Sequence, residues 1–290
     1  MPDWQDIFAA LREDGVNCTD NEIPRPVGGG DISAAWHVGS AFVKTGDTDS
    51  LGMFEAEADG LRELNSAKVI RVPDVLGVGR TNKEAYLAIE WIEFDRPGAA
   101  TERLFGQQLA DLHHHTKDKF GWHRDNTIGL TAQHNQWSDN WLHFFRDQRL
   151  GFQLQLAQRS GFGGELQSAG MTLQENLEAL FGDYKPSASL LHGDLWGGNW
   201  AASGEQPVIF DPAVYYGDRE SDIAMTRLFG GFGQDFYSAY QESWPLHAGY
   251  EDRQKLYQLY HVLNHLNLFG SSYLGRAMQL IRDLNSRITN

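Results

Sequence analysis

The stretch "LLHGDLWGGNW", residues 190–200, opens with two leucines that lead into His192, Gly193 and Asp194. Asn199 follows Asp194 by five positions, with glycines between them. Aspartate, glycine and asparagine are ordinary turn residues, so a strand that ends in such a cluster needs no function. A turn explains the glycines but not the Asp-x-x-x-x-Asn spacing. The spacing gains a chemical meaning only if other residues of the chain complete a site.

The stretch "VIFDPAVYYGD", residues 208–218, places a second acidic residue at the end of an apolar run. Asp211 by itself is a turn cap before Pro212. It follows Asn199 at a distance that allows a hairpin return, which would bring the two side chains together. An amide oxygen and a carboxylate, completed by water and phosphate oxygens, suit Mg²⁺. Asp194 then stays free to accept the proton of a hydroxyl group, so the two stretches together indicate phosphoryl transfer.

The segment 53–64 carries a carboxylate on an apolar helix face. Glu57 falls within the predicted apolar stripe, which consists of Met53, Phe54, Leu61 and Leu64. The acidic residues that point away from this stripe are Glu55, Asp59 and Glu63. An unpaired buried charge is costly, so Glu57 either reaches water at the edge of the stripe or has a cation nearby. Lys44, in the strand-like run AFVKT, is the candidate, because such a pair holds the α- and β-phosphates of ATP in kinases.

Three glycines precede the strand-like runs that lead to Lys44. Gly28, Gly29 and Gly30 begin the sequence GGGDIS, and two runs at 32–38 and 41–45 follow. The motif by itself is nonspecific and is equally a flexible turn. In this position, however, a glycine-rich hairpin lets backbone N–H groups approach phosphates closely. We therefore expect these glycines to lie at a nucleotide.

Composition limits the partners and the compartment. The 290 residues include 24 Lys and Arg against 39 Asp and Glu, which gives a net charge of −15. This balance argues against nucleic acid or an anionic membrane as a partner, whereas ATP arrives with its own magnesium. The single cysteine, Cys18, excludes an internal disulfide framework and a cysteine-built metal site. The N-terminus has no signal-peptide pattern, and no apolar run approaches the roughly 20 residues that span a bilayer, so a cytoplasmic protein is expected.

Hydrophobic periodicity divides the chain into two parts. A helix at the start, two hairpins and a second helix are predicted up to about residue 93. From residue 94 a helical stripe begins, and helical character is predicted for most of the chain as far as Gly182 and again in the C-terminal third. Two short strand-and-loop motifs, described above, interrupt it. The prediction is an α+β fold with an ATP-binding part at 1–93 and a mostly helical part, with the catalytic loop and acceptor site, at 94–290.

These motifs resemble those of the fructosamine kinase (ketosamine kinase) family, relatives of the aminoglycoside and choline phosphotransferases within the protein-kinase-like fold. The similarity rests on "FEAEADGL", "FGWHRDNTIG", "QHNQWSDNWLHFFRDQRL", "LLHGDLWGGNW" and "IFDPAVYYGDRESDIAMTRLFGGF", which extend over most of the chain. The HGD-x4-N pattern alone marks only the wider phosphotransferase group, whereas the intervening Leu-Trp-Gly and "DPAVYYGDRE" point to this family. Gly193, where protein kinases have arginine, and Pro212-Ala213, where they have Phe-Gly, argue against a protein kinase.

The resemblance implies a bilobal fold, with a small sheet-and-helix lobe followed by a mostly helical lobe, and it implies ATP and Mg²⁺. The implied reaction transfers the γ-phosphate to the 3-hydroxyl of a ketosamine, the sugar adduct of a glycated amine, either free or on a protein. The 3-phosphate is unstable and breaks down, which frees the amine. The expected activity is therefore deglycation.

Carried over by position, the resemblance also assigns roles to individual residues. Asp194 is the implied base, and Asn199 and Asp211 are the implied Mg²⁺ ligands. Lys44 is the phosphate clamp and Glu57 its orienter. Backbone groups near Glu90 and Ile92 would hold adenine, Arg219 and Asp222 would brace the catalytic loop, and Trp196 would either stack on the sugar or pack between the lobes.

Other interpretations stay open. A kinase acting on an aminoglycoside, choline or a sugar would keep every ATP residue, and a nucleotide-binding module without catalysis would be expected to have lost Lys44, Asp194 or Asp211. The run His113–His115 suggests a metal site, but successive helical residues point about 100° apart and cannot chelate one ion. Asp125-Asn126 resembles a second catalytic loop without a strand to deliver it. The preferred sugar and the oligomeric state are not fixed by the sequence.

Overall fold

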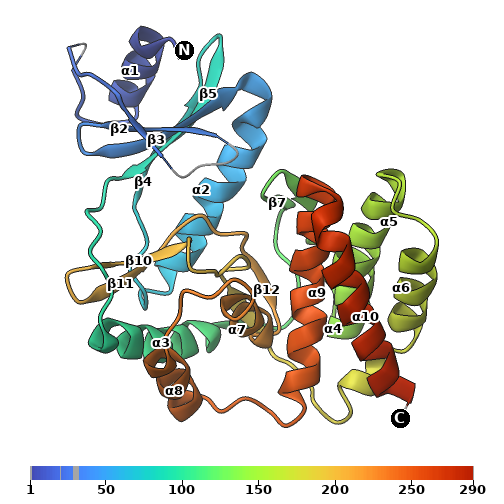
Figure 1. Cartoon of the computed structure of the whole chain (residues 1–290). Coiled ribbons are helices and arrows are strands. Elements are labelled where there is room, and N and C mark those ends of the chain that lie inside the picture. The colour runs from blue at the N-terminus through green and yellow to red at the C-terminus, as the bar shows by residue number, and fades with distance from the viewer. Residues whose placement is uncertain (1, 20, 29–32, 290) are drawn as a thin grey trace.

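The computed structural model describes residues 2–19, 21–28 and 33–289, and Figure 1 presents their arrangement. An antiparallel sheet and two helices form the N-terminal part, and the helical part lies beyond it. The N-terminal elements are α1 (Trp4–Glu13), β1 (Arg25–Val27), β2 (Ala34–Val38), β3 (Ala41–Asp47), α2 (Leu51–Ser66), β4 (Val75–Arg80) and β5 (Glu84–Glu90), with a 3₁₀ turn, η1 (Thr48–Ser50), before α2. The strand order in the sheet is β1-β2-β3-β5-β4.

Each face of this sheet packs against a different helix. Because side chains alternate along a strand, Val43 faces the core under α1 while its neighbour Lys44 faces α2. The α1 core includes Ile7, Phe8, Leu11, Val38 and Ala88. The core under α2 includes Phe54, Leu61, Leu64, Leu87 and Ile89, and it is continuous with the core of the helical part. Strand alternation thus delivers the lysine to the helix that carries Glu57.

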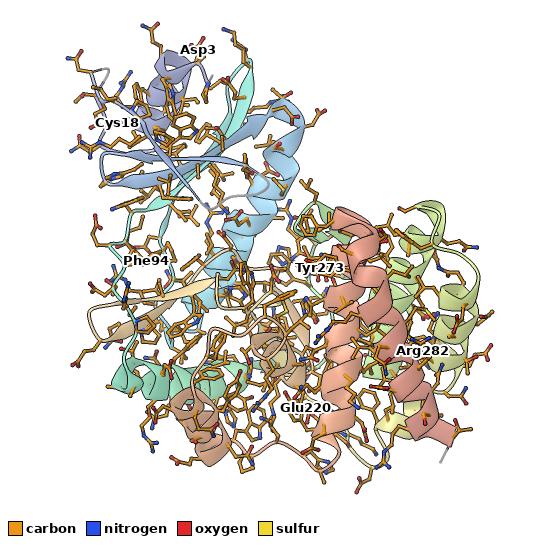
Figure 2. All side chains as sticks on the ribbon, viewed as in Figure 1. Asp3, Cys18, Phe94, Glu220, Tyr273 and Arg282 are labelled. Carbon is orange, nitrogen blue, oxygen red and sulfur yellow. The ribbon has the colours of Figure 1, made fainter. Side chains whose placement is uncertain are left out.

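The helical part contains most of the remaining chain. Its helices are α3 (Ala99–His113), α4 (Trp141–Phe145), α5 (Phe152–Arg159), α6 (Glu165–Glu175), α7 (Glu220–Thr226), α8 (Gln234–Ser243), α9 (Tyr250–Phe269) and α10 (Leu274–Thr289). A π-helical segment, η2 (Arg146–Gly151), joins α4 to α5, and short 3₁₀ turns occur at η3 (Leu177–Leu180) and η4 (Ser271–Tyr273). The chain enters this part past Phe94, which stacks on Phe210 with ring centroids 5.1 Å apart (Figure 2).

Three small sheets shape the helical part. They consist of β6 (Thr116–Lys117), β9 (Ala188–Leu191) and β12 (Tyr215–Gly217); of β7 (Asn126–Ile128) with β8 (Thr131–Gln133); and of β10 (Trp200–Ser203) with β11 (Gln206–Ile209). In the first sheet β9 is central, with β12 and β6 on its two sides. The β10–β11 hairpin returns the chain from Asn199 towards Asp211, as the sequence spacing predicted.

The α+β architecture predicted from the sequence is confirmed, and one local prediction is wrong. Helical character was predicted from α3 as far as Gly182, but residues 116–133 form β6, β7 and β8 and their loops. The physical reason lies in β-branched Thr127, Ile128 and Thr131 flanking Gly129, whose φ of 62° suits a tight turn between two strands. Within residues 2–19, 21–28 and 33–289, no helix combines the length and the apolar character needed to cross a membrane.

Candidate active site

The loop between β9 and β10 carries the motif with which the sequence analysis began. Gly193 has a φ of 83°, and a Cβ there would lie 2.0 Å from the carbonyl oxygen of Ala213. Glycine is therefore required on both counts. His192 accepts a hydrogen bond on its carbonyl from Ala213 N (2.8 Å), and its Nε2 lies 2.9 Å from the carbonyl oxygen of Phe210. The loop is thus bound closely to the segment on either side of Asp211.

Asp222, in the first turn of α7, holds this loop by accepting two hydrogen bonds from its backbone. Its Oδ2 accepts a hydrogen bond from His192 N (2.8 Å) and its Oδ1 accepts one from Gly193 N (2.9 Å). His113 Nε2 lies 3.2 Å from Oδ2. Burial raises the pKa of Asp222, but the hydrogen bonds from His113 and from the Gly193 N–H outweigh it, so the pKa lies below its usual value. The carboxylate therefore stays ionised as the fixed support of the loop.

A buried chain of hydrogen bonds extends this support to α3 and α8. His113 Nδ1 lies 2.8 Å from the hydroxyl of Tyr240, and Arg219 Nη1 donates to the same hydroxyl at 2.9 Å. Burial lowers the pKa of His113, which favours the neutral ring, with its proton on Nε2 facing Asp222. Asp222 thus contacts the catalytic loop directly, whereas Arg219 is connected to Asp222 only through the side chains of Tyr240 and His113.

Asn199 joins the proposed base to the proposed metal ligand. Its Nδ2 donates to the carbonyl oxygen of Asp194 at 2.9 Å, and it lies 3.4 Å both from Asp194 Oδ2 and from the carbonyl oxygen of Asp211. These contacts fix the amide, and its Oδ1 has no donor among the described residues. Phe210 N also donates to the Asn199 carbonyl at 3.1 Å. The motif and the end of β11 therefore form one unit.

Lys44 lies at the centre of a cluster of carboxylates. Its Nζ is 2.7 Å from Glu57 Oε1 and 2.7 Å from Asp211 Oδ1, so the pair predicted from the helix stripe is present. The side chains of Lys44 and Glu57 are almost buried, while that of Asp211 is 44% exposed. Burial lowers the pKa of Lys44, but the charges of Glu57 and Asp211 raise it well above its ordinary value. The ammonium is therefore charged at any physiological pH.

Asp194 is the carboxylate in this group with a pKa suited to proton transfer. Burial, followed by the charges of Asp211 and Asp222, raises its pKa to about 7, and the hydrogen bond from Asn199 opposes the shift only in part. A group with this pKa can both accept and release a proton near neutral pH. Asp211 has no such role because Lys44 holds one of its oxygens. The two carboxylates are thus differentiated by their surroundings.

The structure also locates the other residues that the sequence analysis assigned to ligands. Gly28 directly follows β1 and is exposed, so the glycine motif joins β1 to β2, and β1 was absent from the sequence prediction. Gly29 and Gly30 lie outside the described residues. β5 ends at Glu90, and the N–H of Ile92 has no acceptor among the described residues. Trp196, 39% exposed, meets Phe229 edge to face rather than packing between the lobes.

Some functional residues were missed by sequence reasoning. His113 was assigned to a mixed helix face, yet it is fully buried against Asp222, and a histidine run gives no signal for which ring is structural. Arg124 was not singled out because its partners on α2 are about 65 positions away in the chain. Asp125 and Asn126 hold the β7–β8 hairpin together and contact its own residues and Val214.

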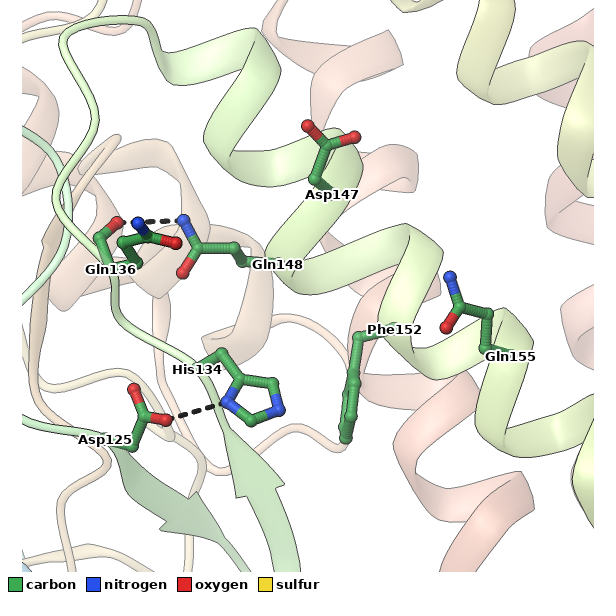
Figure 3. A pocket seen from close by; sticks show the side chains of 7 residues that line it. All are labelled: Asp125, His134, Gln136, Asp147, Gln148, Phe152 and Gln155. Atoms are coloured by element: carbon green, nitrogen blue, oxygen red, sulfur yellow. Dashed lines mark hydrogen bonds and ion pairs between the residues drawn. The ribbon is translucent and has the colours of Figure 1, made fainter.

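A pocket of about 320 Å³ lies on the outer side of this hairpin (Figure 3). It is lined by Asp125, His134, Gln136, Asp147, Gln148, Phe152 and Gln155. Asp125 Oδ2 lies 2.7 Å from His134 Nδ1, and both side chains are about half exposed. None of the residues that contact Asp194 lines this pocket. Across residues 2–19, 21–28 and 33–289, no three His, Cys, Asp or Glu side chains are arranged to hold a metal ion.

The amino-acid sequence is similar to one family of proteins over nearly its full length. Residues 3–287 match the family model described as "Fructosamine kinase". A "Probable ketoamine kinase" of Synechocystis is 43% identical over 286 residues, which cover 96% of each chain. A "Protein-ribulosamine 3-kinase, chloroplastic" of Arabidopsis thaliana is 43% identical over 265 residues, covering 89% of this chain and 81% of the relative.

Solved structures share the fold over nearly the full length. A "Putative fructosamine-3-kinase" from Haemophilus somnus superposes with a TM-score of 0.88 at 30% identity and 97% coverage of both chains. An ADP-bound aminoglycoside phosphotransferase, at 14% identity, a TM-score of 0.65 and 99% coverage of both chains, shares the fold alone. The fold is therefore protein-kinase-like.

Proposed function

The chain belongs to the fructosamine kinase family, and we propose that it is the ATP-dependent kinase that phosphorylates the 3-hydroxyl of a ketosamine. Family membership supports a kinase that uses ATP. The names of the relatives refer to ketoamines, ribulosamines and fructosamines, which are sugar adducts of amines. We extend that substrate class to this chain, with the glycated amine either free or on a protein.

The observation that carries the proposal is the pair of environments around Asp194 and Asp211. Asp194 has a pKa of about 7, and no cation among the described residues pairs with it, which suits a general base. Asp211 is bound to Lys44, which in turn is bound to Glu57, so this carboxylate belongs to the phosphate side of the site. Asn199 connects the two. A catalytic base next to a phosphate-binding cation is the arrangement that phosphoryl transfer requires.

The transfer step uses these residues as follows. Asp194 accepts the proton of the ketosamine 3-hydroxyl while the oxygen forms a bond to the γ-phosphorus. The bond between that phosphorus and the β–γ bridging oxygen breaks, and its electron pair leaves with ADP. Lys44, oriented by Glu57, holds the α- and β-phosphates so that the phosphorus stays in line with the hydroxyl. The 3-phosphoketosamine then eliminates inorganic phosphate, and water hydrolyses the resulting imine, which frees the amine and leaves the sugar as a 3-deoxyosone.

The residues at the end of β11 fit a magnesium ion. Asn199 Oδ1 and Asp211 Oδ2 have no donors among the described residues, while the remaining polar atoms of both side chains are occupied. One amide oxygen and one carboxylate oxygen leave the other positions for water and phosphate oxygens, as Mg²⁺ prefers. We propose that Asn199 and Asp211 hold it. When bound, the ion neutralises the charge of the β- and γ-phosphates.

Further ligand contacts are proposed from position. The N–H of Ile92, which has no acceptor in the described part of the chain, and the backbone at Glu90 lie where the chain leaves β5, so we assign them to adenine. Gly28, with Gly29 and Gly30, is assigned to the phosphates through the β1–β2 turn. The exposed ring of Trp196, two residues after the base, is assigned to the sugar. The ATP-binding part is taken as residues 1–93 and the acceptor part as residues 94–290.

The proposal is tested by acceptor specificity. The purified protein would be incubated with MgATP and, separately, ribulosyl-lysine, fructosyl-lysine, kanamycin and choline, and both ADP and free lysine would be measured. ADP together with free lysine supports a deglycating ketosamine kinase and ranks the two sugars. ADP only with kanamycin or choline would refute the assigned acceptor while leaving a phosphotransferase. ADP release with none of the four would leave the catalytic assignment unsupported.

A further inference from the structure

Helix α2 has two sides with different partners. One side packs against the sheet and presents Glu57 to Lys44. The other carries Glu55, Asp59 and Glu63, whose carboxylates pointed away from the stripe in the sequence pattern. In the structure these three carboxylates contact residues of the helical part. Figure 1 shows α2 extending from the sheet past β7 towards that part.

Arg124, just before β7, holds the first of these contacts. Its Nη1 donates to Asp59 Oδ2 at 2.6 Å, and its Nη2 lies 3.7 Å from Glu55 Oε2 and 3.4 Å from the carbonyl oxygen of Gly52. The Arg124 and Asp59 side chains are only 29% and 31% exposed. One guanidinium thus bridges three residues in the first half of α2.

The next turns of α2 contact the segment that follows Asp211. Gly60 packs so closely that a Cβ there would lie 3.2 Å from Val214 Cγ2. Glu63 Oε1 accepts a hydrogen bond from the Tyr216 hydroxyl at 2.7 Å and lies 3.4 Å from Lys117 Nζ. The helix that presents Glu57 and the segment that presents Asp211 are therefore in contact over the turn from Gly60 to Glu63.

The backbone at Arg124 is itself held in place by hydrogen bonds. Its carbonyl oxygen accepts a hydrogen bond from Asn135 Nδ2 (3.1 Å), and Asp125 Oδ1 accepts one from Asn135 N (2.8 Å). Asp125 also pairs with His134, as Figure 3 shows. Asn126 Nδ2 donates to the carbonyl oxygen of Val214 at 2.9 Å, so this hairpin is bound to the segment after Asp211.

We propose that Arg124 is a positioning residue that holds α2 against the helical part and so keeps the Lys44–Glu57 pair aligned with Asp211. The nucleotide site is then assembled without a swing of α2, and nucleotide binding does not have to provide the free energy of that movement. The inference rests on the proposed function because it concerns its ATP site, but it does not depend on which acceptor is phosphorylated.

The expected effect is a weaker affinity for the nucleotide. If part of the population loses the aligned position of α2, the apparent Kd becomes the intrinsic Kd divided by the fraction that stays aligned. Because the ion pair is about a third exposed, solvent screening limits its contribution. We expect Arg124→Gln to raise the Kd for MgADP by up to about 5-fold, and Asp59→Asn to give a similar change.

The chain offers a matched control. Arg62 Nη1 also pairs with Asp59, at 3.2 Å to Oδ1, but it lies on α2 itself and does not reach the helical part. Arg62→Gln removes the same kind of charge from the same carboxylate without disconnecting α2. It should leave the Kd for MgADP unchanged. The charge exchange Asp59→Arg with Arg124→Asp should recover most of the lost affinity, because it restores a pair between the two parts.

The measurement is calorimetric titration with MgADP, alongside the melting temperature of each variant and the KM values for ATP and acceptor. A raised Kd and KM for ATP in Arg124→Gln and Asp59→Asn, an unchanged KM for acceptor and rescue by the exchange support the proposal. A Kd in Arg124→Gln equal to that of Arg62→Gln overturns it, whatever the melting temperature does. Because MgADP binding needs no acceptor, failure of the ketosamine assay would leave this test intact.

Discussion

At the scale of single residues, Asp194 is the side chain on which the proposed chemistry depends most. Asp194→Asn keeps the shape and the Asn199 contact but removes the base. A positioned base contributes roughly 10² to 10⁴ in rate, so kcat should fall by about that factor while MgADP still binds. Steady-state kinetics and the circular dichroism spectrum check this. Turnover near that of the unmodified protein would refute the role of Asp194.

The pKa of Asp194 also predicts opposite pH trends for activity and stability. Activity requires the ionised base, so kcat/KM should fall as the pH drops below about 7. Stability runs the other way. Because the folded pKa is raised from 3.8 to about 7, the folded state binds this proton more strongly than the unfolded state, and the resulting stabilisation is lost between about pH 4 and 7.

Both trends are measurable with the same pair of proteins. Urea unfolding from pH 4.5 to 8 should show a decline with rising pH in the unmodified protein that is smaller in Asp194→Asn. Identical profiles for the two proteins would mean that another group dominates the dependence. Sequence reasoning proposed Asp194 from its spacing to Asn199 together with Asp211 and the family resemblance, but it could not give the pKa, which depends on burial and on the charges of Asp211 and Asp222.

At the scale of elements, the loop depends on the contact of α3, α7 and α8 through Tyr240. Tyr240→Phe deletes the hydroxyl between Arg219 and His113 and leaves the buried His113 Nδ1 without its partner, whereas Arg219 Nη1 keeps its hydrogen bond to the carbonyl oxygen of Trp244. Unsatisfied buried groups cost about 1–3 kcal/mol each, so the free energy of unfolding should fall by roughly that amount. Urea unfolding and kcat would be measured together. A loss of stability with a modest fall in kcat fits a brace, whereas no change in stability would contradict it.

Elements with a clear period were predictable, and those defined by distant contacts were not. The stripe in α2 and the alternation in β3 correctly paired Glu57 with Lys44, because both periods are local. The strands β6, β7 and β8 were predicted as helix, since they are two or three residues long and pair only through tertiary contacts. The brace of Asp222 by His113 spans 109 positions, and no local pattern encodes such a contact.

At the scale of the whole molecule, one core runs from α2 into the helical part. A ligand that contacts both parts should therefore stabilise the molecule as a unit. MgADP at about 100 times its Kd contributes roughly 2.7 kcal/mol and should raise the melting temperature by about 5 °C. Lys44→Met should remove most of this shift, because it deletes the phosphate contact. Thermal denaturation with and without MgADP measures this shift. A full shift in Lys44→Met would exclude Lys44 from the nucleotide site.

The fold of the whole molecule could be predicted from the sequence, whereas the position of the boundary between its two parts stays a prediction. The order of a glycine motif, a strand lysine, a helix glutamate and the HGD-x4-N loop indicated a phosphotransferase site, and the family resemblance implied the protein-kinase-like fold. The boundary at residue 93 stays a prediction, because α2 belongs by its packing to both parts. Hydrophobic periodicity shows which face of α2 packs against the sheet next to it in the chain. It does not show that the opposite face contacts the helical part.

The ion pair between Lys44 and Asp211 has a consequence for the order in which ligands arrive. These two charges neutralise each other, so a cation that binds Asp211 Oδ2 alone adds an uncompensated positive charge beside the ammonium, and a phosphate that binds Lys44 alone adds an uncompensated negative charge beside the carboxylate. When the cation and the phosphate bind together, their charges compensate each other. The metal ion and the nucleotide should therefore bind with positive cooperativity, each increasing the affinity for the other by the same factor.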